Sequence, residues 1–489
     1  MGLTDRILRG LTASLIGRIV YMLANAALLV ALTRYLMVPE TYGLLYLALS
    51  VLGVAKLFGS MGIPKAGARY VTEFAETDPG QVPFVLRRTL LFSGLLVTVA
   101  AVVLVAIRGH VATLLGEPRL TPLLLLGGGY LVLAMVASFP RMMFQAFNRV
   151  SYSALVRAVE GVGRLAFAVA FVVLGFGAVG ALAGYLAAFA LAGLVGFLLL
   201  HTKFYRGYRA AQTADEGLSR RILGYSVPIT ITRGADVLDS KVDTILVGAL
   251  LNPAAVAFYT LARQIAAFTT SPAMSLGYVL SPALGEQNAA EAEDVAARLY
   301  ERSLAYVLLL YVPAAAGLAL VARPLVRYVI GTQYMDAVPV LQVLCLFVVV
   351  FAVNTITSNS LDYLGRASLR ARARGMTALA NAGLNVLLIP VLGVVGAAVA
   401  TVITYTTYTV ANVYFIHETL GLRPRWLAVR IGLVCVVAFG MASIVVVGRR
   451  YVTNLSTLAV VIGSGLLAWL LLSIVSGLLE PSDVVEKLS

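Results

Sequence analysis

The chain has 489 residues, of which 60% are hydrophobic and 12% are charged. Soluble domains are about 45–50% apolar and about 25% charged, so this composition excludes a soluble globular protein. The formal net charge of +14 does not indicate nucleic-acid binding, because basic residues of membrane proteins gather in cytoplasmic loops. Cys345 and Cys435 lie far apart inside apolar runs, and they predict neither a disulfide framework nor a metal site.

Apolar runs long enough to cross a bilayer, which takes about 20 residues, recur along the whole chain. The first run carries Arg18 in its middle and lacks a cleavage site, so we expect it to be a retained helix rather than a signal peptide. We predict fourteen transmembrane helices, near residues 11–36, 41–61, 88–107, 120–142, 155–175, 178–200, 223–250, 254–283, 303–322, 337–361, 374–392, 394–416, 426–447 and 455–478.

The basic residues test this map of spans. Roughly 24 of the 37 Lys and Arg residues fall in alternate loops and about 7 fall in the others. By the positive-inside rule the first set of loops is cytoplasmic, and both termini are predicted to lie in the cytoplasm as well.

Two pairs of segments match at a spacing of about 215 residues, which indicates an internal repeat. LTRYLMVPETYGLLYLA from Leu32 matches LVGALLNPAAVAFYTLA from Leu246, and GAVGALAG from Gly177 matches GVVGAAVA from Gly393. Arg149 and Arg366 correspond at nearly the same spacing.

The repeat predicts duplicated halves of six helices each. Six crossings are an even number, so the halves run in the same direction and are related by a pseudo-twofold axis along the membrane normal, around a central cavity. We therefore predict an all-α polytopic membrane protein with an N-terminal lobe (1–215), a C-terminal lobe (216–425) and a final helix pair with a cytoplasmic tail (426–489). A transporter that rocks one lobe against the other has this layout.

Ionisable side chains inside a span cost several kcal/mol unless they are paired or hydrated, so each one is a candidate cavity lining. In the first predicted helix, Arg18, Tyr21 and Asn25 form one polar stripe without an acidic residue. Lys56 lies near the cytoplasmic end of the second predicted helix, where a lysine can also snorkel to the interface.

The fifth predicted helix carries Arg157, Glu160 and Arg164 on one face. Glu160 and Arg164 are four residues apart, so they can neutralise each other. Structural pairing and cavity lining both remain open for this group.

The seventh and eighth predicted helices carry the other charges. Four residues of the seventh share an arc of about 120°; they are Arg233, Asp236, Asp239 and Asp243. Lys241 projects elsewhere, and Arg263 near the middle of the eighth helix is a natural partner for one of these acids.

The signs of these charges favour an anionic substrate. The spans hold six cations (Arg18, Lys56, Arg164, Arg233, Lys241 and Arg263) against four carboxylates (Glu160, Asp236, Asp239 and Asp243). The excess belongs to the first lobe, whereas the second is balanced and holds carboxylates that could exchange Na⁺ or H⁺. Arginine suits phosphate through its bidentate fork, while a cavity for cationic drugs should show the opposite sign.

Sequence motifs for catalysis are absent. The chain has no GxxxxGK[ST] phosphate loop, so we expect transport driven by an ion gradient or membrane potential rather than by ATP hydrolysis. Its three histidines, His110, His201 and His417, lie far apart in loops or at helix ends, which disfavours a zinc site or histidine catalysis. We predict no enzymatic activity and no cofactor beyond a coupling ion, Na⁺ or H⁺.

Three stretches carry a family resemblance: LTRYLMVPETYGLLYLALS from Leu32, LFGSMGIPKAGARYV from Leu57 and DTILVGALLNPAAVAFYTLARQI from Asp243. With the fourteen-helix layout, they make the chain resemble the Wzx-type polysaccharide flippases of the multidrug/oligosaccharidyl-lipid/polysaccharide exporter (MOP) superfamily. The resemblance implies the MATE-like fold. It also implies that a polyprenyl- or dolichyl-linked oligosaccharide crosses to the outer leaflet of a prokaryotic cytoplasmic membrane by alternating access.

The resemblance also implies roles for the charged residues. The phosphate or pyrophosphate would be held by Arg18, Arg164 and Arg263, and the sugar would contact Tyr21 and Asn25. Arg233 is also predicted to bind the substrate. Ion coupling, or holding of the arginines, would fall to Glu160, Asp236, Asp239 and Asp243. Partners would be the lipid-linked oligosaccharide, membrane lipids and glycosyltransferases or a polymerase of the same pathway, but no nucleic acid.

Three alternatives remain open at the level of sequence. A drug/cation antiporter of the MATE branch shares the fold but should place an acidic residue in the first lobe's cavity. A lipid II-type flippase also carries a pyrophosphate. A non-transporting scaffold for glycan-assembly enzymes would tolerate neutralisation of all the buried charges.

Overall fold

The computed structural model describes residues 3–209, 211–270 and 293–479, which are helical and contain no strand. The described residues of all fourteen predicted spans fall on helices, and residues 271–283 of the eighth predicted span lie outside the described residues. Eleven segments among the described residues are long and apolar enough to cross a membrane, which confirms a multi-pass membrane protein. The chain forms two compact units, residues 1–256 and 257–489, which are described separately.

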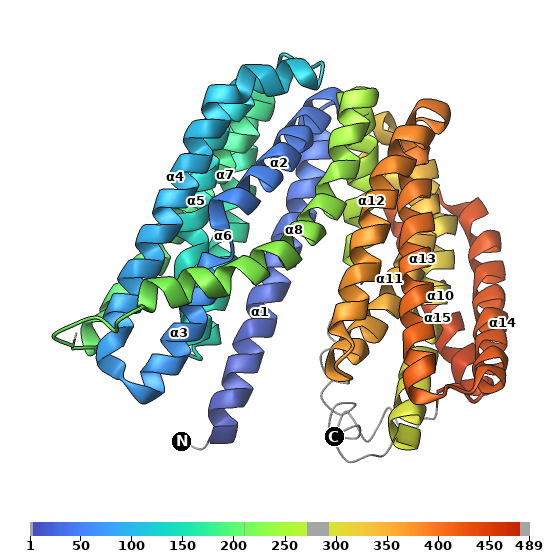
Figure 1. Cartoon of the computed structure of the whole chain (residues 1–489). Helices are drawn as coiled ribbons and strands as arrows, with labels where there is room; N and C mark the ends of the chain where they lie inside the picture. Colours follow the sequence, from blue (N-terminus) through green and yellow to red (C-terminus); the bar gives the residue numbers. More distant parts are fainter. Residues whose placement is uncertain (1–2, 210, 271–292, 480–489) are drawn as a thin grey trace. The chain divides into compact units, whose positions relative to one another are not determined.

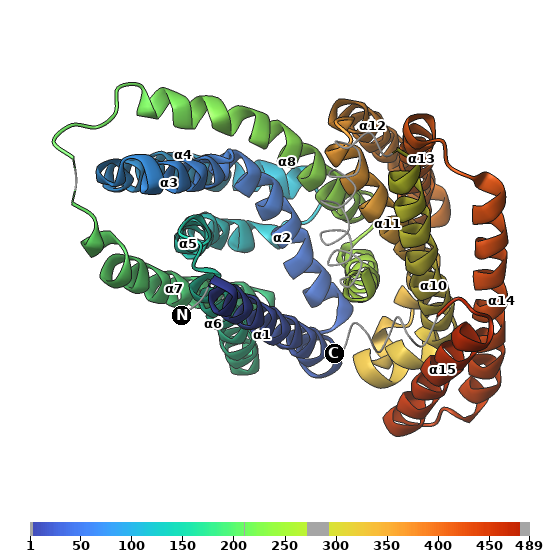
Figure 2. The same ribbon diagram turned by 90° about the horizontal axis from the view of Figure 1, so that it is seen from below.

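The first unit is a helical bundle in which α5 packs against α2, α4, α6 and α7 (Figures 1 and 2). Its helices are α1 (Leu3–Val30), continued by the π-helical turn η1 (Ala31–Leu36), α2 (Pro39–Ser60), α3 (Ile63–Thr77), α4 (Val82–Leu114), α5 (Leu120–Ala146), α6 (Val150–Phe171) with the π-helical turn η3 (Val172–Phe176), α7 (Gly177–Lys203) and α8 (Leu218–Leu250).

In the second unit, α10 packs on α11 and α13 and also on the final pair, α14 and α15 (Figure 2). A helix over residues 253–270 enters this unit. The helices that follow are α10 (Glu293–Leu325), α11 (Ala337–Tyr363), α12 (Ala367–Leu392), α13 (Val394–Leu420), α14 (Pro424–Gly448) and α15 (Leu455–Val475).

Helix α3 was not expected from the sequence, which left residues 62–87 as a loop. It is amphipathic: Ile63, Tyr70 and Phe74 are buried, whereas Lys65 and Arg69 are exposed. It packs on α4, α5 and α8. Because 15 residues are too few to cross a bilayer, this helix leaves the predicted number of crossings unchanged.

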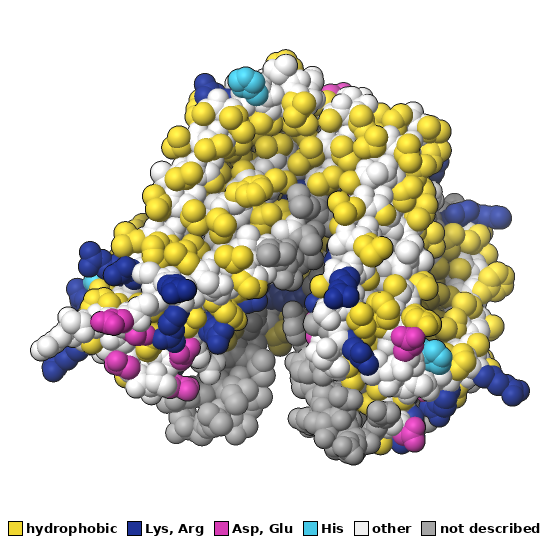
Figure 3. Space-filling view, in the orientation of Figure 1, with side chains coloured by type: hydrophobic (Ala, Val, Ile, Leu, Met, Phe, Trp, Pro, Cys, Tyr) yellow, Lys and Arg dark blue, Asp and Glu magenta, His cyan; other side chains and the backbone are white. Residues whose placement is uncertain are grey.

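Apolar side chains cover the flanks of the helices (Figure 3). On α4, Leu95 is 64% exposed and Val102 is 64% exposed, and on α12 Leu379 is 78% exposed. Large apolar groups left outside a packed bundle are typical of surfaces that face lipid, since acyl chains are as apolar as leucine.

In the first pair of matched segments, helices begin and end at corresponding residues. Pro39 is the first residue of α2, and Pro253 begins the helix over 253–270. Proline suits this position because the first turn of a helix needs no backbone N–H donor. The preceding helical segments end at Leu36 and Leu250, which are also matched residues of the repeat.

The second pair of matched segments shares an unusual backbone corner. Gly177 has φ 53° and ψ −135°, and Gly393 has φ 60° and ψ −145°. Positive φ with such a ψ is essentially restricted to glycine. Arg149 and Arg366 in turn immediately precede α6 and α12. The same local geometry at matched positions agrees with the duplication.

Helix α8 packs on α2, α3 and α4 of the first unit, although the repeat assigns it to the second half of the sequence. The packing units divide the chain after residue 256, whereas the sequence repeat divides it after residue 215. The predicted boundaries at 1–215, 216–425 and 426–489 follow the repeat and stay a prediction.

Candidate functional site

Helix α6 lies between α1 and α7, and small residues allow it to approach both. An ideal Cβ at Gly161 would lie 2.9 Å from Tyr21 Cδ2 of α1, and one at Gly184 of α7 would lie 2.4 Å from the backbone N of Ala168. These close approaches bring Arg164 of α6 against the polar stripe of α1.

Arg164 is bound by uncharged groups on two neighbouring helices. Its Nη2 donates to the hydroxyl of Tyr21 at 2.6 Å and to Oδ1 of Asn25 at 2.9 Å. The guanidinium carbon lies 5.1 Å from the ring centroid of Tyr21 and 5.4 Å from that of Tyr185 on α7. Its Nε is buried and has no hydrogen-bond partner within the described part of the chain. The guanidinium is therefore held in place without being neutralised by a bonded carboxylate.

Glu160 attracts Arg164 electrostatically, but it forms its ion pair with another helix rather than with Arg164. Nη1 of Arg141 on α5 donates to Oε2 of Glu160 at 2.7 Å, and the Glu160 side chain is 8% exposed. The two α6 residues do share a face, but Tyr21 and Asn25 draw the Arg164 side chain toward α1. Arg141 was not singled out from sequence, since it lies at the end of a predicted span.

Five basic side chains of α1, α2, α5 and α6 form one electrostatic group with the carboxylate of Glu160, here called the cationic cluster: Arg18, Lys56, Arg141, Arg157 and Arg164. Lys56 interacts electrostatically with Glu160, Arg141 and Arg164. Arg157 interacts with Arg141, Glu160 and Arg18. The interactions show that Lys56 belongs to the group. The cationic excess predicted for the first lobe is therefore gathered in one place.

The residues predicted on the seventh and eighth helices are only partly described. The side chains of Arg233, Asp236 and Asp239 lie outside the described residues. Asp243 on α8 is 1% exposed. The stem of Lys241 packs on α2, where an ideal Cβ at Gly53 would lie 3.0 Å from Lys241 Cε.

Arg263 belongs to the second unit and lies over an aromatic ring of its own helix. Its guanidinium carbon is 5.7 Å from the ring centroid of Tyr259, and its Nη1 is 3.5 Å from the hydroxyl of that tyrosine. The same hydroxyl is 3.2 Å from Oγ1 of Thr401 on α13. Arg263 is thus linked through Tyr259 to the polar face of α13.

The second unit contains a buried amide network that the sequence analysis missed. Nδ2 of Asn354 on α11 donates to the hydroxyl of Tyr405 at 3.3 Å. Oδ1 of Asn354 accepts from Nδ2 of Asn412 at 2.9 Å and from Oγ of Ser358 at 3.2 Å. The network joins α11 to α13, and its members carry no charge, so a search for ionisable groups passed over them.

Helix α12 adds a second set of amides. Nδ2 of Asn381 donates to Oγ1 of Thr404 at 3.1 Å, and Nδ2 of Asn385 donates to Oδ1 of Asn381 at 2.9 Å. The guanidinium carbon of Arg374 lies 5.1 Å from the ring centroid of Tyr405 and 5.2 Å from that of Tyr408. Polar residues four apart, such as Asn381 and Asn385, are the sequence signal that could have revealed this face.

Replacement of Asn354 by Ala is expected to destabilise the second unit by about 1–2 kcal/mol, because it removes three hydrogen bonds that are each worth about 0.6 kcal/mol inside a membrane protein. The measurement is thermal unfolding followed by a thiol-reactive dye. Cys345 on α11 is 3% exposed and reports unfolding once the exposed Cys435 is replaced by Ser.

The matched control for that measurement is Thr407→Ala on α13, because its hydroxyl is exposed and donates to the carbonyl of Ile403 on its own helix. It should unfold at the parent temperature. Equal melting temperatures for Asn354→Ala and the parent would show that the network does not hold α11 to α13.

The long apolar helices, which enclose a group of basic side chains, define a multi-pass membrane protein. The sequence model of the polysaccharide biosynthesis protein family matches residues 7–287, and that of the MatE family matches residues 228–410. The chain belongs to the polysaccharide biosynthesis protein family. Together with the relatives and solved structures described next, this membership confirms the resemblance to flippases of the MOP superfamily that was seen in the sequence.

Solved structures share the fold. The chain is similar to the lipid II flippase MurJ in an inward closed conformation, with a TM-score of 0.77 and 15% identity over 96% of this chain and 98% of that one. It is also similar to a multidrug resistance MATE family transporter in an inward-facing conformation, with a TM-score of 0.64 and 17% identity over 85% of this chain and 95% of that one. These likenesses confirm the predicted MATE-like fold.

Two curated relatives come from archaea. The uncharacterized membrane protein MJ1068 of Methanocaldococcus jannaschii is 21% identical over 79% of this chain and 80% of its own length. The probable low-salt glycan biosynthesis flippase Agl15 of Haloferax volcanii is 21% identical over 46% of this chain and 49% of its own length.

Proposed function

We propose that this protein moves a polyprenyl- or dolichyl-(pyro)phosphate-linked oligosaccharide from the inner to the outer leaflet of a prokaryotic cytoplasmic membrane, for the assembly of surface polysaccharide or glycoprotein. Both termini lie in the cytoplasm, and alternating access of the two lobes carries the head group across. An ion gradient or the membrane potential drives the movement, without a catalytic step. Glycosyltransferases or a polymerase of the same pathway supply and consume the cargo.

The observation that carries the proposal is the environment of Arg164. A tyrosine hydroxyl, an amide oxygen and two aromatic rings fix its guanidinium, and these neutral groups leave its positive charge available to a ligand. Arginine binds phosphate oxygens with paired, charge-assisted hydrogen bonds. Arg18, Arg157 and Lys56 lie in the same electrostatic group and would share the charge of a pyrophosphate.

In this proposal Tyr21 and Asn25 act as positioning residues for Arg164, which revises the sugar contact implied by the family resemblance. The polar atoms of Asn25 are already engaged, because its Oδ1 accepts from Arg164 and its Nδ2 donates to the carbonyl of Tyr21 at 2.6 Å. The predicted phosphate contact of Arg263 and substrate contact of Arg233 remain part of the proposal. So does the role of Glu160, Asp236, Asp239 and Asp243 in ion coupling or charge pairing. The ion pair between Glu160 and Arg141 supports charge pairing as at least part of the role of Glu160.

The charge sign distinguishes this function from drug antiport. A cationic drug would require carboxylates to outnumber basic groups, whereas the cationic cluster has five basic side chains and one carboxylate. Moving a cation into such a group would add like-charge repulsion at low dielectric. The cluster therefore favours an anionic head group.

The experiment is mass spectrometry of lipid-linked oligosaccharides from cells that lack this gene, with and without a plasmid copy. Accumulation of a carrier-linked glycan on deletion, reversed by the wild-type copy, is the expected result and identifies the cargo. An unchanged lipid pool together with altered sensitivity to cationic drugs would instead favour an antiporter.

A further inference from the structure

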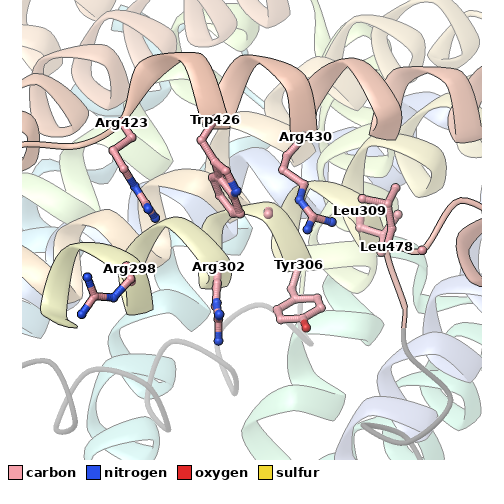
Figure 4. Close-up of a pocket in the computed structure, with 10 residues that line it drawn as sticks. Arg298, Arg302, Tyr306, Leu309, Arg423, Trp426, Arg430 and Leu478 are labelled. Atoms are coloured by element: carbon pink, nitrogen blue, oxygen red, sulfur yellow. The ribbon is translucent and has the colours of Figure 1, made fainter. Parts of the chain in front are cut away.

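A second cationic site lies in the second unit, between the N-terminal half of α10 and the start of α14. It is a pocket of about 430 Å³, closed at one end by the chain that follows α15 (Figure 4). Arginines and aromatic side chains line most of it: Arg298, Arg302 and Tyr306 from α10, and Arg423, Trp426 and Arg430 at the start of α14. Ala305, Leu309, Gly477 and Leu478 complete the wall.

The pocket carries an excess of positive charge. Glu301 is fully buried and binds Arg423: its Oε1 accepts from the Arg423 backbone N–H at 2.6 Å and its Oε2 accepts from Nε at 2.9 Å. The side-chain hydrogen bond to Glu301 raises the pKa of the Arg423 guanidinium, which also interacts with Asp294. Within the described residues, Arg298, Arg302 and Arg430 have no carboxylate within ion-pair distance.

The lining changes from charged to apolar along the pocket. The indole of Trp426 lies between two guanidinium groups, with its ring 5.6 Å from the Arg423 carbon and 5.4 Å from that of Arg430. In Figure 4, Trp426 and Arg430 extend toward the helix that carries Arg302 and Tyr306, and Leu309 and Leu478 lie beyond Arg430. An anionic group with attached hydrocarbon fits such a gradient.

We propose that this pocket binds the phosphate head group of an anionic membrane phospholipid, with Arg302 of α10 and Arg430 of α14 as its main ligands. Basic pockets between transmembrane helices on the cytoplasmic side are suited to anionic lipid head groups. Tryptophan and tyrosine favour the depth at which head groups lie. A phosphate bound to both helices would hold the α14–α15 pair to α10.

The membrane supplies the ligand at the correct depth. The segments that precede α10 and α14 fall in loops that the positive-inside rule places in the cytoplasm. The cytoplasmic leaflet carries anionic lipids, which attract basic residues by about 1 kcal/mol each. The pocket belongs to the second unit, whereas the residues of the cationic cluster all belong to the first.

The test uses tryptophan quenching in the full-length protein. The chain has two tryptophans, so Trp469→Phe leaves Trp426 in the pocket as the only indole. The protein is reconstituted in phosphatidylcholine vesicles that contain 10 mol% of either brominated phosphatidylglycerol or brominated phosphatidylcholine. Brominated phosphatidylglycerol is expected to quench Trp426 more strongly. In the combined Arg302→Gln and Arg430→Gln variant, the binding of phosphatidylglycerol relative to phosphatidylcholine should fall about tenfold or more.

Arg425→Gln is the matched control, because Arg425 is exposed at the start of α14 and does not line the pocket. It should keep the lipid preference. Equal quenching by both brominated lipids in the parent protein overturns the proposal. This comparison does not depend on whether the arginine variants fold. An equal loss in Arg425→Gln also overturns it, since that result would indicate general surface attraction.

Two further results would identify a different ligand. If millimolar inorganic phosphate removes the preference for phosphatidylglycerol, the site binds a soluble anion and the lipid proposal fails. Residues 480–489 include Glu480, Asp483 and Glu486. If the preference arises only after these ten residues are deleted, the chain's own acidic tail is the ligand, which also overturns the proposal. These measurements need no transport activity.

Discussion

Replacement of Arg164 by Met is expected to lower transport of the lipid-linked glycan by two orders of magnitude or more. The physical reason is the loss of a fixed cation whose hydrogen-bond partners, Tyr21 and Asn25, are uncharged. Each charge-assisted hydrogen bond to a phosphate is worth about 1.5–3 kcal/mol, and about 1.4 kcal/mol corresponds to a factor of ten in rate. The measurement is the amount of accumulated lipid-linked oligosaccharide in cells that carry only the variant.

Two companion variants separate charge from geometry. Arg164→Lys keeps the charge but loses the planar fork, so we expect partial activity. Tyr21→Phe removes the hydroxyl that accepts from Arg164 at 2.6 Å and should cost about tenfold, because the guanidinium loses one of its fixed partners. Wild-type transport by the Met variant would exclude Arg164 as a phosphate ligand. Poor expression of all three variants would instead show that Arg164 supports folding.

Replacement of Gly396 by Ala is expected to destabilise the second unit by about 3 kcal/mol or more, at the upper end of the usual cost of overpacking. A Cβ at this position would lie 2.3 Å from the carbonyl oxygen of Leu388 and 2.6 Å from its carbonyl carbon on α12. These are backbone atoms, so no side-chain rotation can relieve the overlap. Helices α12 and α13 would have to separate near their shared corner.

The measurement is again unfolding reported by Cys345, and the melting temperature should fall by about 5 °C or more. Gly383→Ala on α12 is the matched control, since its added Cβ would have no heavy atom within 4 Å. That change should be neutral or stabilising because alanine favours the helix over glycine. If both variants melt alike, the close approach at Gly396 does not limit stability.

Much of the fold could be predicted because its signals are local. An apolar run of sufficient length specifies a span, and Pro39 and Pro253 begin helices at matched positions of the repeat. Helix α3 had a readable signal as well: Ile63, Tyr70 and Phe74 recur at helical spacing on its buried face. The charged residues between them, and its short length, led to its prediction as a loop.

The sequence could predict which residues belong to the candidate site, but not which of them bond to each other. The stripe of Tyr21 and Asn25 on α1 was visible from helical periodicity, yet its bond to Arg164 depends on how closely α6 approaches α1. The partner of Glu160 is Arg141, which belongs to another helix, and no spacing along the chain encodes that contact. Pairs between helices depend on packing, which the sequence pattern of a single helix does not contain.

The hairpin that turns at Gly177 has a consequence for the order in which the chain folds. Helices α6 and α7 are consecutive, so closing the loop between them costs little entropy, and they can pair during synthesis. Arg164 and Glu160 enter the membrane after Tyr21, Asn25 and Arg141, which are the groups that bind them. Both of these charged residues of α6 thus meet a partner that has already been synthesised, so neither is left unpaired in lipid until a later part of the chain is made.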